Sequence, residues 1–450
     1  MRLVNQIKNS ELGRNVALLM TGNGLSQIFV LLISPLITRL FTTAEIGVYA
    51  FFISIVNISS VVSSGRYENA IVIAKDEKEA INVFALSFVL SLAISALLFL
   101  GISVLFFSDY SFFESEISQI WAFLIPLLSF LLSLYNLFRF YALRNKDYKH
   151  ISASMPAESL TNGGLSLLFG WLIGGAWTLI IAGIISKIVA VYILFSSSIK
   201  SIRENIKLLS FDEMKNVARI HYKFPLFEGP SALLYTFGQQ GIVIFLVKLF
   251  NDSIAGVYSY TNRILLTPVQ FFSSSFTQVM YQKLSEVKNT NSKDYFSLLA
   301  RSTNSMFYYL IIPYFIFVFT ARYYVPFIFG DNWVELYKYM YVLAPYSMII
   351  LVSAAFTNVF KIDNKQDVAL LLKILFVVSR IAIIIIGASL HWNILQTLLL
   401  FSIVSVLSIL SSFFIYYFQV KKPIPHSIYS YILVSFVVYF ILFQYFNISL

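Results

Sequence analysis

The sequence predicts an all-α integral membrane protein, with about 12–13 transmembrane helices in two parallel six-helix bundles around a central polar cavity. Composition is the first reason: 58% of the 450 residues are hydrophobic, 12% are charged and mean hydropathy is +0.78, whereas soluble domains carry about 25% charged residues. The second is a series of apolar runs of about 20 residues, the length that crosses a hydrocarbon core of roughly 30 Å. The third is a motif near the N-terminus that returns at mid-chain.

Each apolar run predicts one membrane helix. The first run follows Arg2, Lys8 and Arg14 and is too long for the apolar region of a cleavable signal peptide, so we expect it to remain as a helix. The runs predict twelve helices and a thirteenth, at residues 16–41, 46–64, 81–107, 119–143, 151–172, 176–196, 224–249, 256–281, 297–320, 337–360, 368–390, 395–418 and 428–447.

Lysine and arginine are concentrated in alternate connections between these runs. Most of the 32 such residues fall at 1–14, 65–80, 144–150, 197–223, 282–296, 361–373 and 419–426. Because cytoplasmic connections of membrane proteins are enriched in Lys and Arg, this side and the N-terminus are predicted to be cytoplasmic. Membrane topology therefore explains the net charge of +10, and no nucleic-acid partner is expected.

The recurring motif marks the turn of a helical hairpin in each half. Residues 39–50 read RLFTTAEIGVYA and residues 248–259 read KLFNDSIAGVYS, so Leu-Phe and Gly-Val-Tyr recur at an offset of 209 residues (248 minus 39). Six crossings separate the first helix from the seventh, and an even number gives both halves the same orientation. The match is short, and chance similarity between hairpin turns is the alternative.

The repeat and the charges together predict the domain organisation. The expected parts are an N-terminal six-helix bundle, a cytoplasmic linker, a C-terminal six-helix bundle and an extra transmembrane helix, at residues 1–196, 197–223, 224–418 and 419–450. The linker is the longest and most charged connection, which predicts an amphipathic helix on the membrane surface.

Polar residues follow one face of several predicted helices. In the third helix these are the small Ser87, Ser91 and Ser95, which predict close packing between helices. Four other helices carry longer series: Asn23, Gln27, Ser34 and Thr38; Ser54, Asn57, Ser60 and Ser64; Glu228, Ser231, Tyr235 and Gln239; and Arg263, Thr267, Gln270, Ser274, Thr277 and Tyr281. Because polar groups that face lipid would each cost several kcal/mol, we expect these faces to line a water-filled cavity. Hydrogen bonding between helices of a dry bundle is the alternative.

Ionisable residues inside a span are costly, so they are candidates for substrate binding. The deepest cations are Lys187, Arg263 and Arg380, while Arg66 and Glu68 lie near the cytoplasmic end of the second helix. For Lys187 an equal alternative is a stem that reaches the interface, and for Arg66 and Glu68 snorkelling or a mutual contact is favoured. The excess of positive charge indicates an anionic cargo, because arginine pairs with phosphate oxygens through two hydrogen bonds.

Two carboxylates and two further cations complete the candidate residues. Glu158 in the fifth helix and Glu228 in the seventh are candidate proton carriers for ion coupling. The repeat places Arg39 in register with Lys248 at the outer ends of the two halves, and we expect an outer gate in which these two residues meet. Snorkelling toward lipid headgroups is the alternative for both.

Catalytic, metal and cofactor sites are not expected. The chain has no cysteine, which excludes disulfides, thiolate metal sites and cysteine nucleophiles. The 4 histidines stand singly, the HExxH and Walker A motifs are absent, and no pair of carboxylates shares a helix face in a polar cleft. The sequence therefore predicts a transporter that is not an enzyme, and whose transport is passive or driven by an ion gradient.

Three segments, in order along the chain, resemble one known family. They read GNGLSQIFVLLISPLITRLFTTAEIGVYAFFISI from residue 22, SGRYENAIVIAKDEKEA from residue 64 and YSYTNRILLTPVQFFSSSFTQVMYQKLSE from residue 258. They are similar to the Wzx-type O-antigen flippases of the multidrug/oligosaccharidyl-lipid/polysaccharide exporter superfamily, and the resemblance covers the first twelve helices. The thirteenth helix departs from the usual twelve.

The resemblance implies a two-lobed carrier in the bacterial inner membrane. Its cargo would be an undecaprenyl-diphosphate-linked saccharide for lipopolysaccharide O-antigen or a similar surface polysaccharide, and its partners the lipid bilayer, a polysaccharide polymerase and a chain-length regulator. Arg263 stands where related lipid-diphosphate flippases place a lumen arginine. Arg66 and Glu68 stand in the SGRYEN segment.

Two other functions are alternatives to a flippase. A membrane-embedded polysaccharide polymerase or glycosyltransferase usually has a sizeable external catalytic loop, and the largest outer connection here, residues 321–336, is too short for one. A multidrug exporter of the same superfamily is disfavoured by the excess of cations in the spans.

Overall fold

A computed structural model of the protein describes residues 11–107, 120–290, 292–356, 358–363 and 365–446. The described chain is helical and contains no strand, and ten of its helices are long and apolar enough to cross a membrane. A helix occupies each predicted apolar run. The predicted all-α membrane fold with two helical halves is therefore confirmed, while the first ten residues and the Ser274 side chain lie outside the described part.

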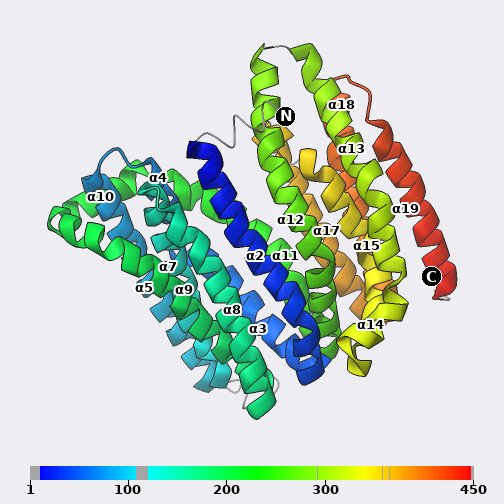
Figure 1. Ribbon diagram of the computed structural model, residues 1–450, viewed down its shortest axis with the longest axis horizontal. Helices are drawn as coiled ribbons and strands as arrows, with labels where there is room; N and C mark the ends of the chain where they lie inside the picture. The colour runs from blue at the N-terminus through cyan, green and yellow to red at the C-terminus, as the bar shows by residue number, and fades with distance from the viewer. Residues whose placement is uncertain (1–10, 108–119, 291, 357, 364, 447–450) are drawn as a thin grey trace. The chain divides into compact units, whose positions relative to one another are not determined.

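The helices pack into two compact units. Unit 1 holds the described residues up to Phe41 and Val48–Gln240. Its helices are α2 (Glu11–Leu40), most of α3 (Thr43–Ser63), α4 (Ala70–Ile73), α5 (Glu77–Phe107), α7 (Leu124–Arg144), α8 (Tyr148–Leu172), α9 (Ala176–Asn205), α10 (Phe211–Ile220) and the first half of α11 (Gly229–Leu249). Within unit 1, α8 packs against α2 and α9, and α7 packs against α5 and α9 (Figure 1).

The region predicted as a separate linker, residues 197–223, is part of unit 1. Helix α9 continues to Asn205, and α10 lies against α5 with Val217 in the buried core. The Asn82 amide fixes the turn between α9 and α10, because it donates to the Leu208 carbonyl at 3.0 Å and accepts from the Ser210 N–H at 3.1 Å. These contacts explain why the segment does not stand apart from the bundle.

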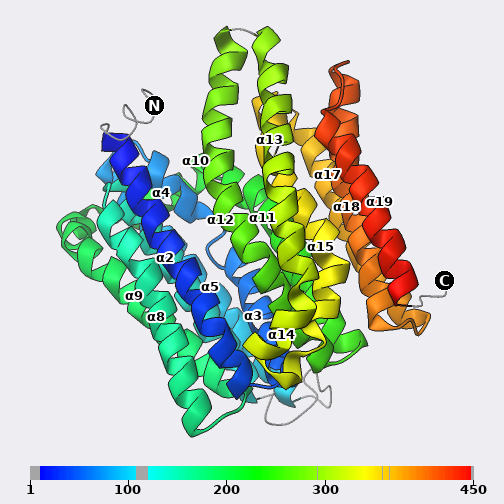
Figure 2. The same cartoon turned by 45° about the vertical axis from the view of Figure 1, so that its right-hand side comes forward.

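Unit 2 holds Thr42–Gly47 and the described residues from Gly241 onward. Its helices are the second half of α11, α12 (Asp252–Thr290), α13 (Ser292–Phe319), α14 (Ala321–Phe329), α15 (Leu336–Val352), α16 (Val359–Ile362), α17 (Gln366–Ser389), α18 (Ile394–Gln419) and α19 (His426–Tyr445). Helix α15 is the centre of this unit, because it packs against α12, α13, α18 and α19 and is almost wholly buried. Figure 2 shows α19 running beside α13.

The boundaries between the two units differ from the predicted domain boundaries. The predicted boundaries are at 196, 223 and 418, whereas the chain passes between the units after Phe41, after Gly47 and after Gln240. Helix α19 belongs to unit 2 and forms no separate part. Hydrophobic pattern locates helices but not the packing of each turn, which explains this difference.

One predicted span is interrupted. The run at 337–360 forms α15 only to Val352, and a 3₁₀ turn at Ser353–Ala355 and the short α16 follow. Two side chains of α12 satisfy carbonyls released by the break: Thr277 donates to Ala354 at 2.9 Å and Lys288 donates to Ile362 at 2.6 Å. Non-helical backbone at membrane depth is tolerated where protein groups satisfy it in this way.

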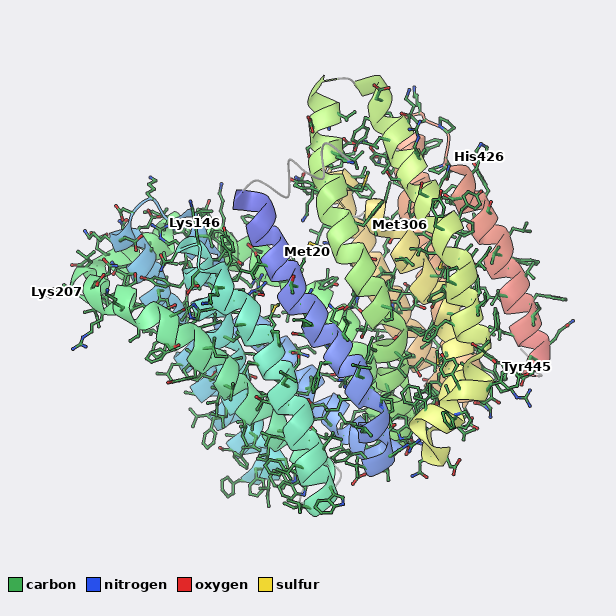
Figure 3. All side chains as sticks on the ribbon, viewed as in Figure 1. Met20, Lys146, Lys207, Met306, His426 and Tyr445 are labelled. Carbon is green, nitrogen blue, oxygen red and sulfur yellow. The ribbon has the colours of Figure 1, made fainter. Side chains whose placement is uncertain are left out.

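The basic connections define one side of each unit, which we call the basic side. In unit 1 it carries residues 65–80, 144–150 and 197–223, and in unit 2 residues 282–296, 361–373 and 419–426. In Figure 3, Lys146 and Lys207 lie toward the same end of unit 1, while His426 and Tyr445 mark the two ends of α19. The placement within each unit agrees with the alternation predicted from charge.

The repeated Gly-Val-Tyr motif has a steric cause. A β-carbon on Gly47 would lie 1.8 Å from the Asp252 carbonyl oxygen, and one on Gly256 would lie 1.9 Å from the Thr43 carbonyl oxygen. At the repeat offset Thr43 corresponds to Asp252 and Gly47 to Gly256, so the contact is reciprocal. The first turns of α3 and α12 therefore cross with their backbones touching, which only glycine permits at both positions.

Substitution at this crossing is expected to destabilise the protein. Gly47→Ala or Gly256→Ala must push two backbones apart, and overpacking of this kind costs about 1–3 kcal/mol. Gly101→Ala in α5 and Gly164→Ala in α8 are matched controls, because nothing lies within 4 Å of a β-carbon at either position. Thermal unfolding of the purified variants measures the effect, and equal melting temperatures for all four would contradict the crossing.

The C-terminus is expected on the outer side of the membrane. Helix α19 has 20 residues, is one of the helices long and apolar enough to span, and follows Lys421 and Lys422 on the basic side. A phosphatase reporter fused after Leu450 should be active, and a β-galactosidase reporter at the same place inactive. The reverse pattern would mean that α19 does not cross.

Candidate functional site

The predicted intramembrane cations are divided between the two units and have different partners. Lys187 and Arg66 belong to unit 1, and Arg263 and Arg380 belong to unit 2. A cation that is already neutralised by a carboxylate has little charge left for an anionic ligand. The partners of each cation therefore decide which of them could bind cargo.

Arg66 lies at the sharp bend that follows α3. Gly65 and Arg66 both adopt left-handed backbone angles, with φ of 58° and 61°, and the chain then turns into the 3₁₀ helix Tyr67–Asn69. A non-glycine residue in this region is uncommon and is typical of functional or strained positions. The bend directs the Arg66 guanidinium toward α11.

The Arg66 cluster consists of Ser64, Arg66, Glu68, Asn69 and Glu228. Arg66 makes ion pairs with Glu68 at 3.4 Å and Glu228 at 3.2 Å, and Asn69 donates to the same Glu228 oxygen at 2.6 Å. Glu68 is 2% exposed and accepts from Ser64 at 2.5 Å. The predicted contact between Arg66 and Glu68 is present, and Glu228 joins them from a position 162 residues away.

Local backbone and burial set the chemistry of this cluster. Glu228 ends the π-helical turn Phe224–Glu228, a rare geometry that is frequent at functional sites. Burial raises the pKa of Glu68, although the hydrogen bond from Ser64 and the charge of Arg66 partly offset this effect. The cluster therefore holds two carboxylates on one guanidinium, one of them biased toward the protonated form.

Lys187 and Glu158 form an ion pair between α9 and α8. Lys187 Nζ lies 2.5 Å from Glu158 Oε1, and the side chains are 13% and 28% exposed. The ammonium group also lies 4.6 Å from the centroid of the Tyr135 ring, whose hydroxyl is 3.3 Å from the Ser154 hydroxyl. The predicted cargo cation and the predicted coupling carboxylate are thus one neutralised pair, and Lys187 does not snorkel in isolation.

Arg380 on α17 is enclosed by aromatic rings. It is 1% exposed, and its guanidinium carbon lies 4.5 Å from the Phe401 centroid, 4.6 Å from Phe376 and 5.0 Å from Tyr346. Ring faces stabilise a cation electrostatically when it is desolvated. A cargo contact through Arg380 stays a prediction, because in this structure the rings cover the side chain.

Arg263 on α12 differs from the other three. Its side chain is half-buried, its guanidinium carbon lies 5.8 Å from the Tyr260 ring centroid, and its carbonyl accepts from Thr267 at 2.5 Å. Within the described part of the chain, no carboxylate lies within 4.0 Å of it. Arg263 therefore keeps its positive charge available on a helix that the sequence predicts to span the membrane.

The polar stripes and gate residues are placed as follows. Asn57 and Gln239 are half-buried, and Gln270 is exposed on α12. Gln240, which the helical stripe missed by one position, accepts a hydrogen bond from Ser54 at 3.1 Å. Arg39 at the end of α2 and Lys248 at the end of α11 are exposed, and their meeting at an outer gate stays a prediction.

Three further residues contact the candidate charged residues but were not predicted from the sequence. Asn69 was passed over because a single asparagine in a loop carries no pattern, although it lies in the quoted SGRYEN segment. Tyr135 and Tyr260, which lie against Lys187 and Arg263, were missed because aromatic residues are frequent in membrane helices. The position of Tyr260 three residues before Arg263 is a signal that helix periodicity could have provided.

Comparison with protein families decides the relationship. Residues 36–338, more than half of the chain, match the family described as polysaccharide biosynthesis protein. The chain belongs to the polysaccharide biosynthesis protein family. No curated protein sequence matches the chain.

Solved structures place the fold of this polysaccharide biosynthesis protein among known transporters. It is similar to a multidrug resistance MATE family transporter of the MOP superfamily in its inward-facing conformation, with 15% identity, a TM-score of 0.63, and coverage of 89% of this chain and 94% of that chain. It is also similar to MATE in complex with MaL6, at 15% identity and TM-score 0.60, and to a MOP superfamily transporter from Pyrococcus furiosus, at 15% identity and TM-score 0.57, each over 93% of this chain and 98% of that chain. The protein therefore shares the fold of these transporters, and with ten apolar helices long enough to span it is a multi-pass membrane protein.

Proposed function

We propose that this protein is a flippase for undecaprenyl-diphosphate-linked oligosaccharide, the repeat unit of O-antigen or of a similar surface polysaccharide. It moves the lipid-linked saccharide from the cytoplasmic to the periplasmic leaflet of the bacterial inner membrane by alternating access. The N-terminus and the basic side face the cytoplasm. Family membership in polysaccharide biosynthesis and the MOP transporter fold support this proposal together.

The observation that carries the proposal is the charge of Arg263. A guanidinium cannot be relieved of its charge by deprotonation, and keeping it in a span without a carboxylate is costly. An anionic ligand that enters the membrane removes this cost, and a diphosphate offers the oxygen geometry that arginine pairs with. The other three predicted cargo cations differ from it: Arg66 and Lys187 are paired with carboxylates, and Arg380 is enclosed by aromatic rings.

Other predicted site residues act together with the contact between Arg263 and the diphosphate. Asn57, Gln239 and Gln270 supply hydrogen bonds to the saccharide, and these bonds need no fixed charge. The Lys187–Glu158 pair and the Arg66 cluster are the ion-coupling candidates, because each holds a carboxylate whose protonation would release a cation. The protein performs no covalent chemistry in this account, and its partners are the bilayer, the polysaccharide polymerase and the chain-length regulator.

A multidrug exporter is the second candidate, favoured by the names of the structural neighbours. Loss of the gene, followed by mass spectrometry of lipid extracts, tests the proposal. A flippase mutant should accumulate undecaprenyl-diphosphate-linked saccharide and lose surface polysaccharide. Normal lipid-linked saccharide together with increased drug sensitivity would identify an exporter instead.

A further inference from the structure

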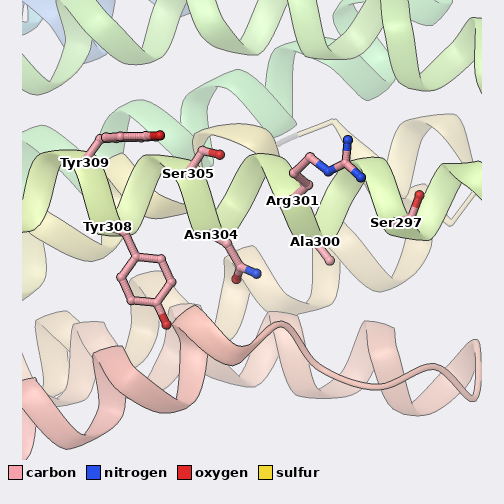
Figure 4. A pocket seen from close by; sticks show the side chains of 7 residues that line it. All are labelled: Ser297, Ala300, Arg301, Asn304, Ser305, Tyr308 and Tyr309. Atoms are coloured by element: carbon pink, nitrogen blue, oxygen red, sulfur yellow. The ribbon is translucent and has the colours of Figure 1, made fainter.

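A groove lies along α13, near the start of α19, on the basic side of unit 2. It has a volume of about 460 Å³, and its lining includes Arg301, Asn304, Tyr308 and Tyr309. Figure 4 shows Asn304 and Tyr308 directed toward α19, with Arg301 on the neighbouring face of α13. The groove uses none of the residues assigned to transport above.

Two contacts hold the walls of the groove together. The Ser427 N–H donates to Asn304 Oδ1 at 3.1 Å, and the hydroxyls of Tyr308 and Ser430 lie 3.2 Å apart. Both join the first turns of α19 to the middle of α13. Helix α19 thus holds two of the side chains that line the groove in place.

The charge of the groove is positive. Arg301 is exposed, and among the described residues no carboxylate lies within 4.0 Å of its guanidinium. Lys422, in the segment that precedes α19, stands 5.4 Å from the ring centroid of Phe296, the residue before the groove begins. The acidic residue on the same helix, Asp294, lies seven residues before Arg301, or about 10 Å along the axis.

The groove begins near the basic end of the apolar segment of α13. Arg301 lies about 10 Å inside the apolar segment Asp294–Phe319, counted from the basic end. Tyr308 and Tyr309, which lie about 10–12 Å farther along α13, are 51% and 79% exposed and present a polar tip on an apolar body. Farther along, exposed apolar side chains continue on both helices: Ile312, Ile316, Leu433 and Phe436.

We propose that this groove binds the phosphate of an anionic bilayer phospholipid, with its acyl chains along the apolar faces of α13 and α19. Arg301 pairs with the phosphate oxygens, Tyr308 and Asn304 flank the headgroup, and Lys422 adds a second positive charge. The exposed apolar side chains that continue along both helices favour a phospholipid, whose acyl chains they would contact. The inference is independent of the proposed transport activity.

Lipid titration by native mass spectrometry tests the proposal on the full-length protein in detergent. We expect phosphatidylglycerol to bind about 10-fold more tightly than phosphatidylcholine, as charge-assisted hydrogen bonds predict. Arg301→Gln should abolish this preference, and Arg301→Lys should retain part of it. The matched control is Arg219→Gln, which removes an exposed arginine from α10 in unit 1 and should leave the preference unchanged.

Four outcomes would overturn the proposal. Equal binding of both phospholipids, or an unchanged preference in Arg301→Gln, would mean that Arg301 recognises no headgroup. Displacement of phosphatidylglycerol by inorganic phosphate at equal concentration would indicate a site for free anions. Tighter, Arg301-dependent binding of undecaprenyl phosphate would assign the groove to the carrier lipid. Surface polysaccharide in the Arg301→Gln strain reports separately on transport.

Discussion

Replacing Arg263 with alanine is expected to abolish surface polysaccharide without reducing the amount of protein in the membrane. The variant loses both the fixed charge and the two-pronged donor geometry that would hold a diphosphate. Because no described carboxylate lies within 4.0 Å of Arg263, its removal leaves no buried anion behind. The measurement is surface polysaccharide in a flippase-null strain, with membrane abundance determined by immunoblot.

Two further variants define the role of Arg263. Arg263→Lys keeps the charge but loses the bidentate geometry, so partial activity is expected. Arg322→Ala, at an exposed position in α14, is the control and should retain full activity. Normal polysaccharide together with normal abundance for Arg263→Ala would exclude the binding role, whereas loss of abundance would indicate a structural tie between helices.

Replacing Lys187 with methionine is expected to reduce the stability and abundance of the protein strongly. The change removes the partner of Glu158, which is 28% exposed and lies on a predicted membrane helix. Breaking a buried ion pair by removing one partner costs about 3–5 kcal/mol, because an uncompensated charge remains. Fluorescence-detected size-exclusion chromatography of heated samples measures the loss.

The double variant Lys187→Met/Glu158→Gln should recover most of that stability, because replacing a buried ion pair by neutral groups is often tolerated. The matched control is Lys338→Met, whose ion pair with Glu335 lies between neighbouring turns at an exposed surface and should matter little. Equal losses for the single and double variants would contradict the pairing. A stable double variant without polysaccharide would assign ion coupling to the pair, and one with normal polysaccharide would leave it a structural role.

Local pattern was sufficient for most of the fold. Apolar runs located the helices, because a span of about 20 residues has few other uses, and alternate basic connections grouped the loops by side. The stripe of Ser87, Ser91 and Ser95 predicted packing, and these residues are 0%, 1% and 7% exposed. The repeat predicted two related hairpins, and the reciprocal contact of Gly47 and Gly256 gives the motif its steric reason.

The sequence did not predict which residues far apart in the chain contact each other. Glu158 and Glu228 were candidates on their own, yet one neutralises Lys187 and the other meets Arg66 across 162 residues. A single sequence gives the depth of such residues but not the rotation of the helices that brings them together. The interruption after Val352 was missed for a similar reason, because the groups that satisfy its free carbonyls belong to α12.

The central claim is that the protein moves a lipid-diphosphate-linked saccharide between leaflets. The direct measurement uses vesicles that contain the purified protein and undecaprenyl-diphosphate-linked saccharide in both leaflets, with a glycosidase added outside. We predict that the wild-type protein makes the inner-leaflet saccharide accessible, so that cleavage goes to completion, and that Arg263→Ala stops after the outer leaflet. The assay is run without a gradient and with proton or sodium gradients of either direction. If the wild-type protein leaves the inner-leaflet saccharide protected from the glycosidase under all of these conditions, the proposed transport is contradicted.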